Sequence, residues 1–253
     1  MSKRYIGLMS GTSMDGIDAV LVLIEGDELR VEAALSHPWP TAHELHQLCT
    51  PGDNEIDRMG VADNLVAREF AAATHALLAK AGLTPKEIRA IGSHGQTIRH
   101  RPQLGFTLQI GNAALLAALT GIDVIADFRT MDMALGGQGA PLVPAYHAAL
   151  AGGLARERFP VAFVNIGGIA NVTFVPATGD PVAFDCGPGN ALIDQWVQTH
   201  AGIPYDSGGR VASEGAVDEE VVDAYLGKPF FVRRGPKSLD RNDFTLASIA
   251  LPE

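Results

Sequence analysis

The order of apolar and polar positions predicts short strands that alternate with helices. Two apolar runs, residues 5–9 and 19–24, flank a segment rich in glycine, hydroxyl groups and aspartate, which predicts a strand, a tight turn and a returning strand. A polar, proline-containing stretch follows and extends through Pro51. Apolar residues then recur at helical spacing over residues 56–81, and Gly82 is a typical helix end.

The same alternation continues up to residue 151. Thr84 and Glu87 form a capping box with proline at the first helical position, which predicts the start of a short helix. The further expected elements are a strand at 106–110, a buried helix at 113–119, a strand at 122–126 and a helix at 143–151. Strands that alternate with helices are typical of an α/β sheet.

A second hairpin repeats the opening pattern. Residues 161–166 predict a strand, Gly167 and Gly168 a turn, and residues 171–175 a returning strand. The two hairpins share a pattern of apolar and small residues but not an amino-acid sequence, so by itself the repeat is weak support for a duplicated fold. Glycine, arginine and glutamate interrupt the apolar pattern around residues 152–160, and we expect a domain boundary there.

The final part of the sequence is less regular. A strand at 181–184 leads into Asp185 and a Gly-Pro-Gly turn, and helices are expected at 191–200 and 214–226. Residues 245–253 contain neither a capping element nor a closing strand. We therefore expect an incomplete second domain.

Composition and charge narrow the class of protein. With 253 residues, 47% apolar and 19% charged, the chain can bury a sizeable core and resembles a soluble α/β protein. The net charge of −10 argues against nucleic acid or an anionic membrane as the main partner. Cys49 and Cys186 are the only cysteines, which argues against a disulfide framework. Without a signal-peptide pattern or a membrane-length apolar run, a cytoplasmic location is expected.

The segment between the first two strands has the chemistry of a phosphate clamp. Gly11 and Gly16 permit close backbone approach, Thr12 and Ser13 carry hydroxyl donors, and two carboxylates are available to a metal ion, those of Asp15 and Asp18. A hairpin that only reverses direction needs about two residues. An ordinary loop is the alternative interpretation.

Asp185 is the sharpest single candidate for catalysis. It is expected at the end of a strand, where α/β sheets bind ligands, and its carboxylate could act as a general base toward water or a hydroxyl group. The alternative is an aspartate that caps the following turn or helix. The neighbouring Cys186 is expected to be a small buried residue and not a nucleophile.

Other polar residues follow strands or lie in glycine-rich loops. His94 is either a ligand contact or a hydrogen-bonded structural histidine, and Arg129 either clamps an anionic group or pairs with Asp127 or Asp132. Gln138 lies in a glycine-rich loop that either touches a substrate or acts as a flexible crossover. No P-loop, dinucleotide fingerprint, zinc-protease motif or serine-hydrolase elbow occurs in the sequence.

Taken together, these segments resemble the anhydro-N-acetylmuramic acid kinase family over residues 5–244. The segments, in family order, are Ile6-Gly7-Leu8-Met9-Ser10-Gly11-Thr12-Ser13-Met14-Asp15-Gly16-Ile17-Asp18, Ile91-Gly92-Ser93-His94-Gly95-Gln96-Thr97, Ala126-Asp127-Phe128-Arg129, Gly136-Gly137-Gln138-Gly139-Ala140-Pro141-Leu142-Val143-Pro144, Asn165-Ile166-Gly167-Gly168 and Phe184-Asp185-Cys186-Gly187-Pro188-Gly189-Asn190. Family members are longer, with a nucleoside-contacting segment and further helices that this sequence does not match.

The resemblance implies a fold of the actin-like ATPase and sugar-kinase superfamily. That fold is α/β, with two ribonuclease-H-like domains and ATP in the central cleft between them. The domains would be residues 1–155, with the first phosphate hairpin and sugar-site loops, and residues 156–253, an incomplete second domain with the second hairpin. A homodimer is compatible with the sequence, which does not set the oligomeric state.

The resemblance also implies a reaction and its residues. ATP and Mg²⁺ would support cleavage of the 1,6-anhydro bond of anhydro-N-acetylmuramic acid with phosphorylation at O6, giving N-acetylmuramate 6-phosphate and ADP in cell-wall recycling. Asp185 falls on the catalytic base. The ATP phosphates would be held by Gly11, Thr12, Ser13, Met14, Asp15, Gly16, Ile17, Asp18, Asn165, Gly167 and Gly168. Mg²⁺ would be held by Asp15 and Asp18. The sugar would be held by His94, Gln96, Arg129, Gln138, Gly187 and Asn190.

Two alternatives remain beside this enzyme. One is a fragment that binds sugar or a partner without ATP turnover and exposes an apolar face. The other is a different activity of the same superfamily, such as another sugar kinase or a chaperone-type ATPase, which the segments around His94 and Gln138 disfavour.

Overall fold

The computed structural model describes residues 2–11, 14, 16–26, 28–39, 45–239 and 243–244. By its internal contacts the chain divides into two compact units, Met1–Gly136 and Gly137–Glu253. The helix at 144–152 groups with the second unit because it packs on a strand of that unit. The predicted domain boundary after residue 155 stays a prediction.

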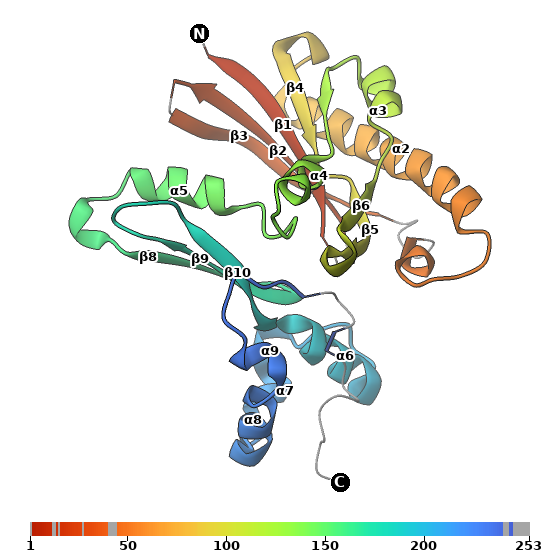
Figure 1. Ribbon diagram of the computed structural model, residues 1–253. Helices are drawn as coiled ribbons and strands as arrows, with labels where there is room; N and C mark the ends of the chain where they lie inside the picture. The colour runs from red at the N-terminus through yellow and green to blue at the C-terminus, as the bar shows by residue number, and fades with distance from the viewer. Residues whose placement is uncertain are drawn as a thin grey trace. The chain divides into compact units, whose positions relative to one another are not determined.

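The first unit is built on a mixed five-stranded sheet in the order β3-β2-β1-β4-β7 (Figure 1). Its strands are β1 (Lys3–Ser10), β2 (Ile17–Glu25), β3 (Glu28–His37), β4 (Ile88–Ser93) and β7 (Val124–Ile125). The first three strands are antiparallel neighbours, whereas β4 runs parallel to β1 and β7 parallel to β4. The predicted first hairpin is confirmed.

Strand β3 is absent from the sequence prediction, which treats this region as a polar stretch. Glutamate and arginine alternate with apolar residues in β3 because it is the edge strand of the sheet, where charged side chains reach water. Glu32 accepts from Arg4 Nε on β1 at 2.6 Å and from Arg30 at 3.1 Å. The edge position of β3 therefore explains the polar composition that prevented its prediction as a strand.

Helix α2 (Glu55–Ala81) supplies most of the helical side of this core. Its fully buried side chains include Val66, Phe70 and Leu77, and it contacts β1, β2, β3 and α3 (Ala113–Thr120). As predicted, α2 ends at Gly82, which adopts the left-handed conformation. At the start of α3, the Asn112 side chain accepts the backbone N–H of Leu115 at 2.9 Å.

Smaller elements complete the first unit. They are the two-stranded sheet of β5 (Gln96–Arg101) and β6 (Phe106–Ile110), helix α4 (Phe128–Ala134), and the 3₁₀ turns η1 (Gln47–Cys49), η2 (Pro85–Glu87) and η3 (Pro102–Leu104). The Thr84–Glu87 capping box is present, but the helix that it starts is only the single turn η2. Residues 122–126, predicted as a full strand, contribute only the two residues of β7.

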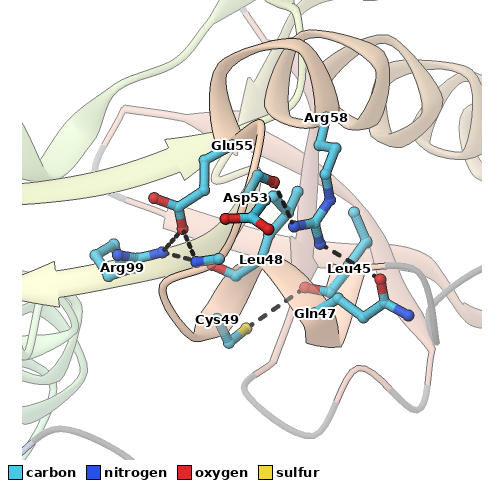
Figure 2. A network of polar contacts seen from close by, with 9 residues as sticks. Leu45, Gln47, Leu48, Cys49, Asp53, Glu55, Arg58 and Arg99 are labelled. Atoms are coloured by element: carbon cyan, nitrogen blue, oxygen red, sulfur yellow. Dashed lines mark hydrogen bonds and ion pairs between the residues drawn. The ribbon is translucent and has the colours of Figure 1, made fainter.

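A polar network joins the start of α2 to β5 (Figure 2). Arg99 donates to Glu55 at 2.7 Å and to the carbonyl of Leu48 at 3.0 Å, and this bond to Arg99 lowers the pKa of Glu55 below its usual value. Arg58 donates to the carbonyl of Asp53 at 3.2 Å. The network therefore joins β5 to η1 and to the start of α2.

The second unit contains an antiparallel sheet in the order β10-β9-β8. Its strands are β8 (Val161–Ile166), β9 (Ile169–Val175) and β10 (Val182–Pro188), so the predicted second hairpin is confirmed. Helix α5 (Pro144–Gly152) packs on one face of this sheet. Its His147 ring stacks on Phe163 at 4.5 Å between centroids and shares a 2.8 Å hydrogen bond with the Thr173 hydroxyl.

Short helices follow the sheet of the second unit. They are α6 (Asn190–Ala201), α7 (Arg210–Ser213), α8 (Glu219–Leu226), α9 (Pro229–Val232) and the 3₁₀ turn η5 (Ser207–Gly209), whereas the 3₁₀ turn η4 (Arg156–Arg158) precedes β8. The helix predicted at 214–226 begins only at Glu219, because the Asp218 side chain caps it by accepting the Val221 N–H at 3.1 Å. None of the helices in the described part of the chain is long and apolar enough to cross a membrane.

Candidate functional site

The first candidate hairpin joins β1 to β2. Its backbone closes through a bond from the Met14 N–H to the Gly11 carbonyl at 3.2 Å, and Met14 adopts a φ of 55°. The side chains of Met14 and Ile17 are buried in the core, so only their backbone atoms are available to a phosphate group. Asp18 is exposed on β2. Thr12, Ser13 and Asp15 lie outside the described residues.

The turn after β4 lies against this hairpin. The His94 N–H donates to the Leu8 carbonyl at 3.0 Å, and the Ser10 hydroxyl lies 3.5 Å from the Gly95 carbonyl. Gly95 has a φ of +71°, and a Cβ there would lie 2.5 Å from the Ile110 carbonyl oxygen, so only glycine fits. The structure therefore brings the first hairpin and the predicted sugar-binding segment together at one end of the sheet.

His94 and Arg129 form a direct pair within this unit. The Nε–H of Arg129 donates to His94 Nε2 at 2.8 Å, and His94 Nδ1 lies 2.8 Å from the Gly95 carbonyl. A carbonyl only accepts, so Nδ1 carries the proton, and Nε2 accepts from a guanidinium. The imidazole is thus neutral, and burial, helped by the Arg129 charge, lowers the pKa of His94 to about 4.

This pair predicts a pH-dependent stability of the first unit. Because the folded-state pKa of His94 lies below its usual value of 6.5, the unfolded chain binds more protons between about pH 6.5 and pH 4. The stabilising contribution of the neutral His94 is present above pH 6.5 and is lost as the pH falls through this window, by about 3 kcal/mol in the free energy of unfolding. Urea unfolding of a Trp196→Phe background, followed by the buried Trp39, measures it.

The matched comparison is His94→Gln against His75→Gln, which changes an exposed histidine of α2. The free energy of unfolding of His94→Gln should fall less than that of the parent between pH 7 and pH 4.5, whereas His75→Gln should follow the parent. Parallel curves for the parent and His94→Gln would contradict a neutral, buried His94.

Two buried polar groups lie at the end of β4 and the start of β5. Ser93 is 1% exposed and Gln96 is 0% exposed, and Gln96 Nε2 donates to the Thr97 carbonyl at 3.0 Å. Among the residues that the structure describes, Ser93 Oγ and Gln96 Oε1 have no hydrogen-bond partner. Such atoms carry an uncompensated desolvation penalty that a ligand or water would relieve.

In the second unit, the second hairpin and α6 are bonded to each other. The N–H groups of Gly189 and Ala191 donate to the Gly168 carbonyl at 2.9 and 3.3 Å, and the Asn190 N–H donates to the Gly167 carbonyl at 2.7 Å. The Asn190 side chain also donates to the Ile166 carbonyl at 3.2 Å. The predicted second phosphate turn and the predicted sugar residue Asn190 are therefore adjacent.

Asp185 lies inside β10 and not after its end, which corrects the sequence prediction. The strand continues to Pro188 because a register shift between Asp185 and Gly187 accommodates an extra residue, Cys186. Asp185 is 6% exposed, and its Oδ2 accepts the N–H of Leu239 at 2.8 Å. Helix α6 has Gly189 as its N-cap residue and no side-chain cap. The helix-capping alternative for Asp185 is therefore not realised.

The remaining candidates, Gly187, Gln138 and Asn165, belong to the second unit. Gly187 is buried, and a Cβ there would lie 2.9 Å from the ring of Phe231. Gln138 is partly buried in the loop before α5, and Asn165 is exposed opposite Asn171.

Burial, followed by the Asp185 charge, raises the pKa of Cys186, so its thiol stays protonated, in line with the prediction against a nucleophile. The described residues contain no cluster of three or more His, Cys, Asp or Glu side chains suited to a metal ion.

The candidate residues thus form two groups. The first unit brings together the β1–β2 hairpin, His94, Gln96 and Arg129, and the second unit brings together the β8–β9 turn, Asp185 and Asn190. Sequence reasoning missed Lys237 and Leu239, whose segment bonds to Asp185. Neither residue belongs to a recognisable pattern, so no sequence signal pointed to them.

Comparison with known proteins yields a family match over nearly the whole chain. The family model described as anhydro-N-acetylmuramic acid kinase matches residues 3–251. The anhydro-N-acetylmuramic acid kinase of Shewanella halifaxensis is 50% identical over 251 residues, which cover 97% of this chain and 67% of that protein. The Bordetella pertussis protein of the same name is 52% identical over 248 residues, covering 96% and 64%. The chain therefore spans about two thirds of the length of these relatives.

Solved structures are similar only at a distance. A Ppx/GppA family member from Aquifex aeolicus has a TM-score of 0.39 and 8% identity, covering 77% of this chain and 54% of that one. A reductive activator for corrinoid, iron-sulfur protein has a TM-score of 0.45 and 15% identity, covering 76% and 32%. Structural similarities this weak support no conclusion about the site.

Proposed function

The chain belongs to the anhydro-N-acetylmuramic acid kinase family, and on this premise we propose that it takes part in ATP-dependent cleavage and phosphorylation of anhydro-N-acetylmuramic acid. The products would be N-acetylmuramate 6-phosphate and ADP. The observation that carries the proposal is the environment of Asp185, a buried carboxylate held at a strand bulge close to the second hairpin. A fixed carboxylate of this kind suits a general base.

In the proposed reaction, Asp185 removes a proton from a water molecule that attacks the anomeric carbon of the sugar. The new bond joins the water oxygen to that carbon, and the bond from the carbon to O6 of the anhydro bridge breaks. The released O6 takes the γ-phosphoryl group of ATP, and ADP leaves. Asp185 later returns its proton to solvent. The other residues of the site would position the reactants and stabilise the charge on the transferred phosphoryl group, the two effects that dominate catalysis of phosphoryl transfer.

The residues present fit the proposed ligands. The glycine-rich hairpin of the first unit offers backbone groups to phosphate oxygens, and the buried, unpartnered Ser93 Oγ and Gln96 Oε1 suit a polyhydroxylated sugar. Mg²⁺ usually takes one or two protein carboxylates besides phosphate oxygens, and the exposed Asp18 can supply one of these carboxylates. When bound, the ion would neutralise phosphate charge. The roles of the individual residues, the cytoplasmic location and the homodimer stay predictions.

We further propose that the units are two ribonuclease-H-like domains and that the second is incomplete. The sheet of unit one has three antiparallel strands extended by two parallel ones, whereas the described residues of unit two form three antiparallel strands without such an extension. Val164 and Ile166 on β8 are 64% and 65% exposed, and Phe174 and Val182 point from the same sheet face, being 42% and 46% exposed. Such a contiguous apolar face supports a missing layer of structure.

The same exposed face favours a second candidate function, a fragment that binds the sugar without turning over ATP. The assay that separates the two measures phosphate transfer from ATP to anhydro-N-acetylmuramic acid in ¹⁸O-labelled water. The proposed enzyme should yield a product with the label in the sugar and none in the phosphate group, because water attacks carbon and not phosphorus.

Each outcome of this assay has a distinct meaning. Sugar binding by calorimetry without product would favour the non-catalytic fragment. Label in the phosphate group would contradict attack on the anomeric carbon. Neither binding nor turnover would contradict both candidate functions.

A further inference from the structure

Lys237 is a buried lysine that the proposed reaction does not use. Lys237 is 7% exposed, whereas the other described lysines and arginines are more exposed. Its Nζ donates to the carbonyl groups of Phe230 at 2.8 Å and Arg233 at 2.9 Å, and lies 4.3 Å from the centroid of the Phe230 ring. Burial of an ammonium group is costly unless its donors are satisfied, so this geometry fixes the side chain.

The backbone around Lys237 is bonded to Asp185. The Lys237 carbonyl accepts the Asp185 N–H at 2.9 Å, and two residues later the Leu239 N–H donates to Asp185 Oδ2 at 2.8 Å. Residues 235–239, which we call the strap, therefore run along the edge of β10 that does not face β9. A Cβ at Gly235 would lie 2.8 Å from the Phe184 ring, so the strap also packs closely on the strand.

We propose that Lys237 is a positioning residue that anchors the strap to the end of α9 and thereby holds the Asp185 carboxylate in place. This inference rests on the proposed role of Asp185 as the base. The anchor is the pair of carbonyl groups at the end of α9, a site where lysine side chains commonly bond. The anchored strap makes two hydrogen bonds to Asp185, one to its backbone N–H and one to its side chain.

The charge of Lys237 acts in the same direction as the strap. A hydrogen bond from the Leu239 N–H and a nearby ammonium group both favour the ionised carboxylate, the form that a general base needs. The titratable group beside Asp185 on its own strand is the Cys186 thiol, whose pKa is raised by burial and by the Asp185 charge and lowered by the Lys237 charge. The thiol therefore stays protonated, and Lys237 is the cation of the strap whose charge acts on this site.

The test is a ¹³C NMR titration of the Asp185 carboxyl group in the full chain, assigned with Asp185→Asn. Lys237→Met keeps the length of the side chain and removes the charge and both bonds. It should raise the pKa of Asp185 by about one pH unit. Lys237→Arg, which keeps charge and donors, should restore most of the parent value. Should Lys237→Met fail to fold, Lys237→Gln retains one donor and should give a smaller rise of about half a unit.

The control is Lys228→Met, which removes a lysine of the same unit that lies 5.4 Å from the Tyr225 ring centroid. It should leave the Asp185 titration within about 0.3 pH units of the parent, since it does not belong to the strap. An unchanged pKa in Lys237→Met and Lys237→Gln, or an equal rise in Lys228→Met, would overturn the inference. The titration needs no turnover, so an inactive parent chain would contradict the proposed function and leave this test valid.

Discussion

Asp185→Asn should lower the rate of phosphate transfer to the anhydro sugar by about a thousandfold, because a positioned general base contributes about 10²- to 10⁴-fold. The amide oxygen of asparagine can still accept the Leu239 N–H that Asp185 Oδ2 accepts at 2.8 Å. The substitution therefore removes the base and keeps the local structure. Steady-state kinetics should show the loss in kcat, with the KM for ATP within about twofold of the parent.

The matched control is Asp180→Asn, an equal change at an exposed aspartate just before β10. Its rate should equal that of the parent. Equal and measurable rates for the parent and Asp185→Asn would remove Asp185 from the role of base. A loss of the same size in Asp180→Asn would point to a general effect of charge and not to proton transfer.

Gly189→Ala should cause the largest loss of stability, more than about 3 kcal/mol in the free energy of unfolding of the second unit. An added Cβ would lie 2.1 Å from the Gly167 carbonyl oxygen, a distance that no packing adjustment of a side chain relieves. The contact must open, and the hydrogen bonds from residues 189–191 to the hairpin turn would be lost. Trp196 lies on α6, so its fluorescence in a Trp39→Phe background follows this transition.

Gly152→Ala is the control in the same unit. This glycine ends α5, has an ordinary φ, and an added Cβ would meet nothing within 4 Å. Its free energy of unfolding should stay within about 0.5 kcal/mol of the parent. A Gly189→Ala protein that unfolds within 1 kcal/mol of the parent would show that α6 does not depend on its contact with the turn.

Elements with a strong local pattern could be predicted from the sequence. Helix α2 and its glycine end were predicted within one residue, and both hairpins form where glycine separates two apolar runs. Strand β3 was missed because its edge position tolerates charge. The late start of α8 depends on the Asp218 cap, which outweighs the helical spacing upstream. Neither the edge position of β3 nor the Asp218 cap can be read from the spacing of apolar residues.

The sequence by itself determined the family and the α/β alternation and indicated the residue types of the candidate site, because segment chemistry and apolar periodicity are local properties. Only the tertiary structure decided that Asp185 lies at a bulge inside β10, that Arg129 bonds to a neutral His94, and that Lys237 anchors the strap. The Arg129–His94 bond joins residues 35 positions apart, and the bond from Leu239 of the strap to Asp185 joins residues 54 positions apart. They depend on which strands pair and which groups are desolvated, and both are decided by the packing of the whole unit.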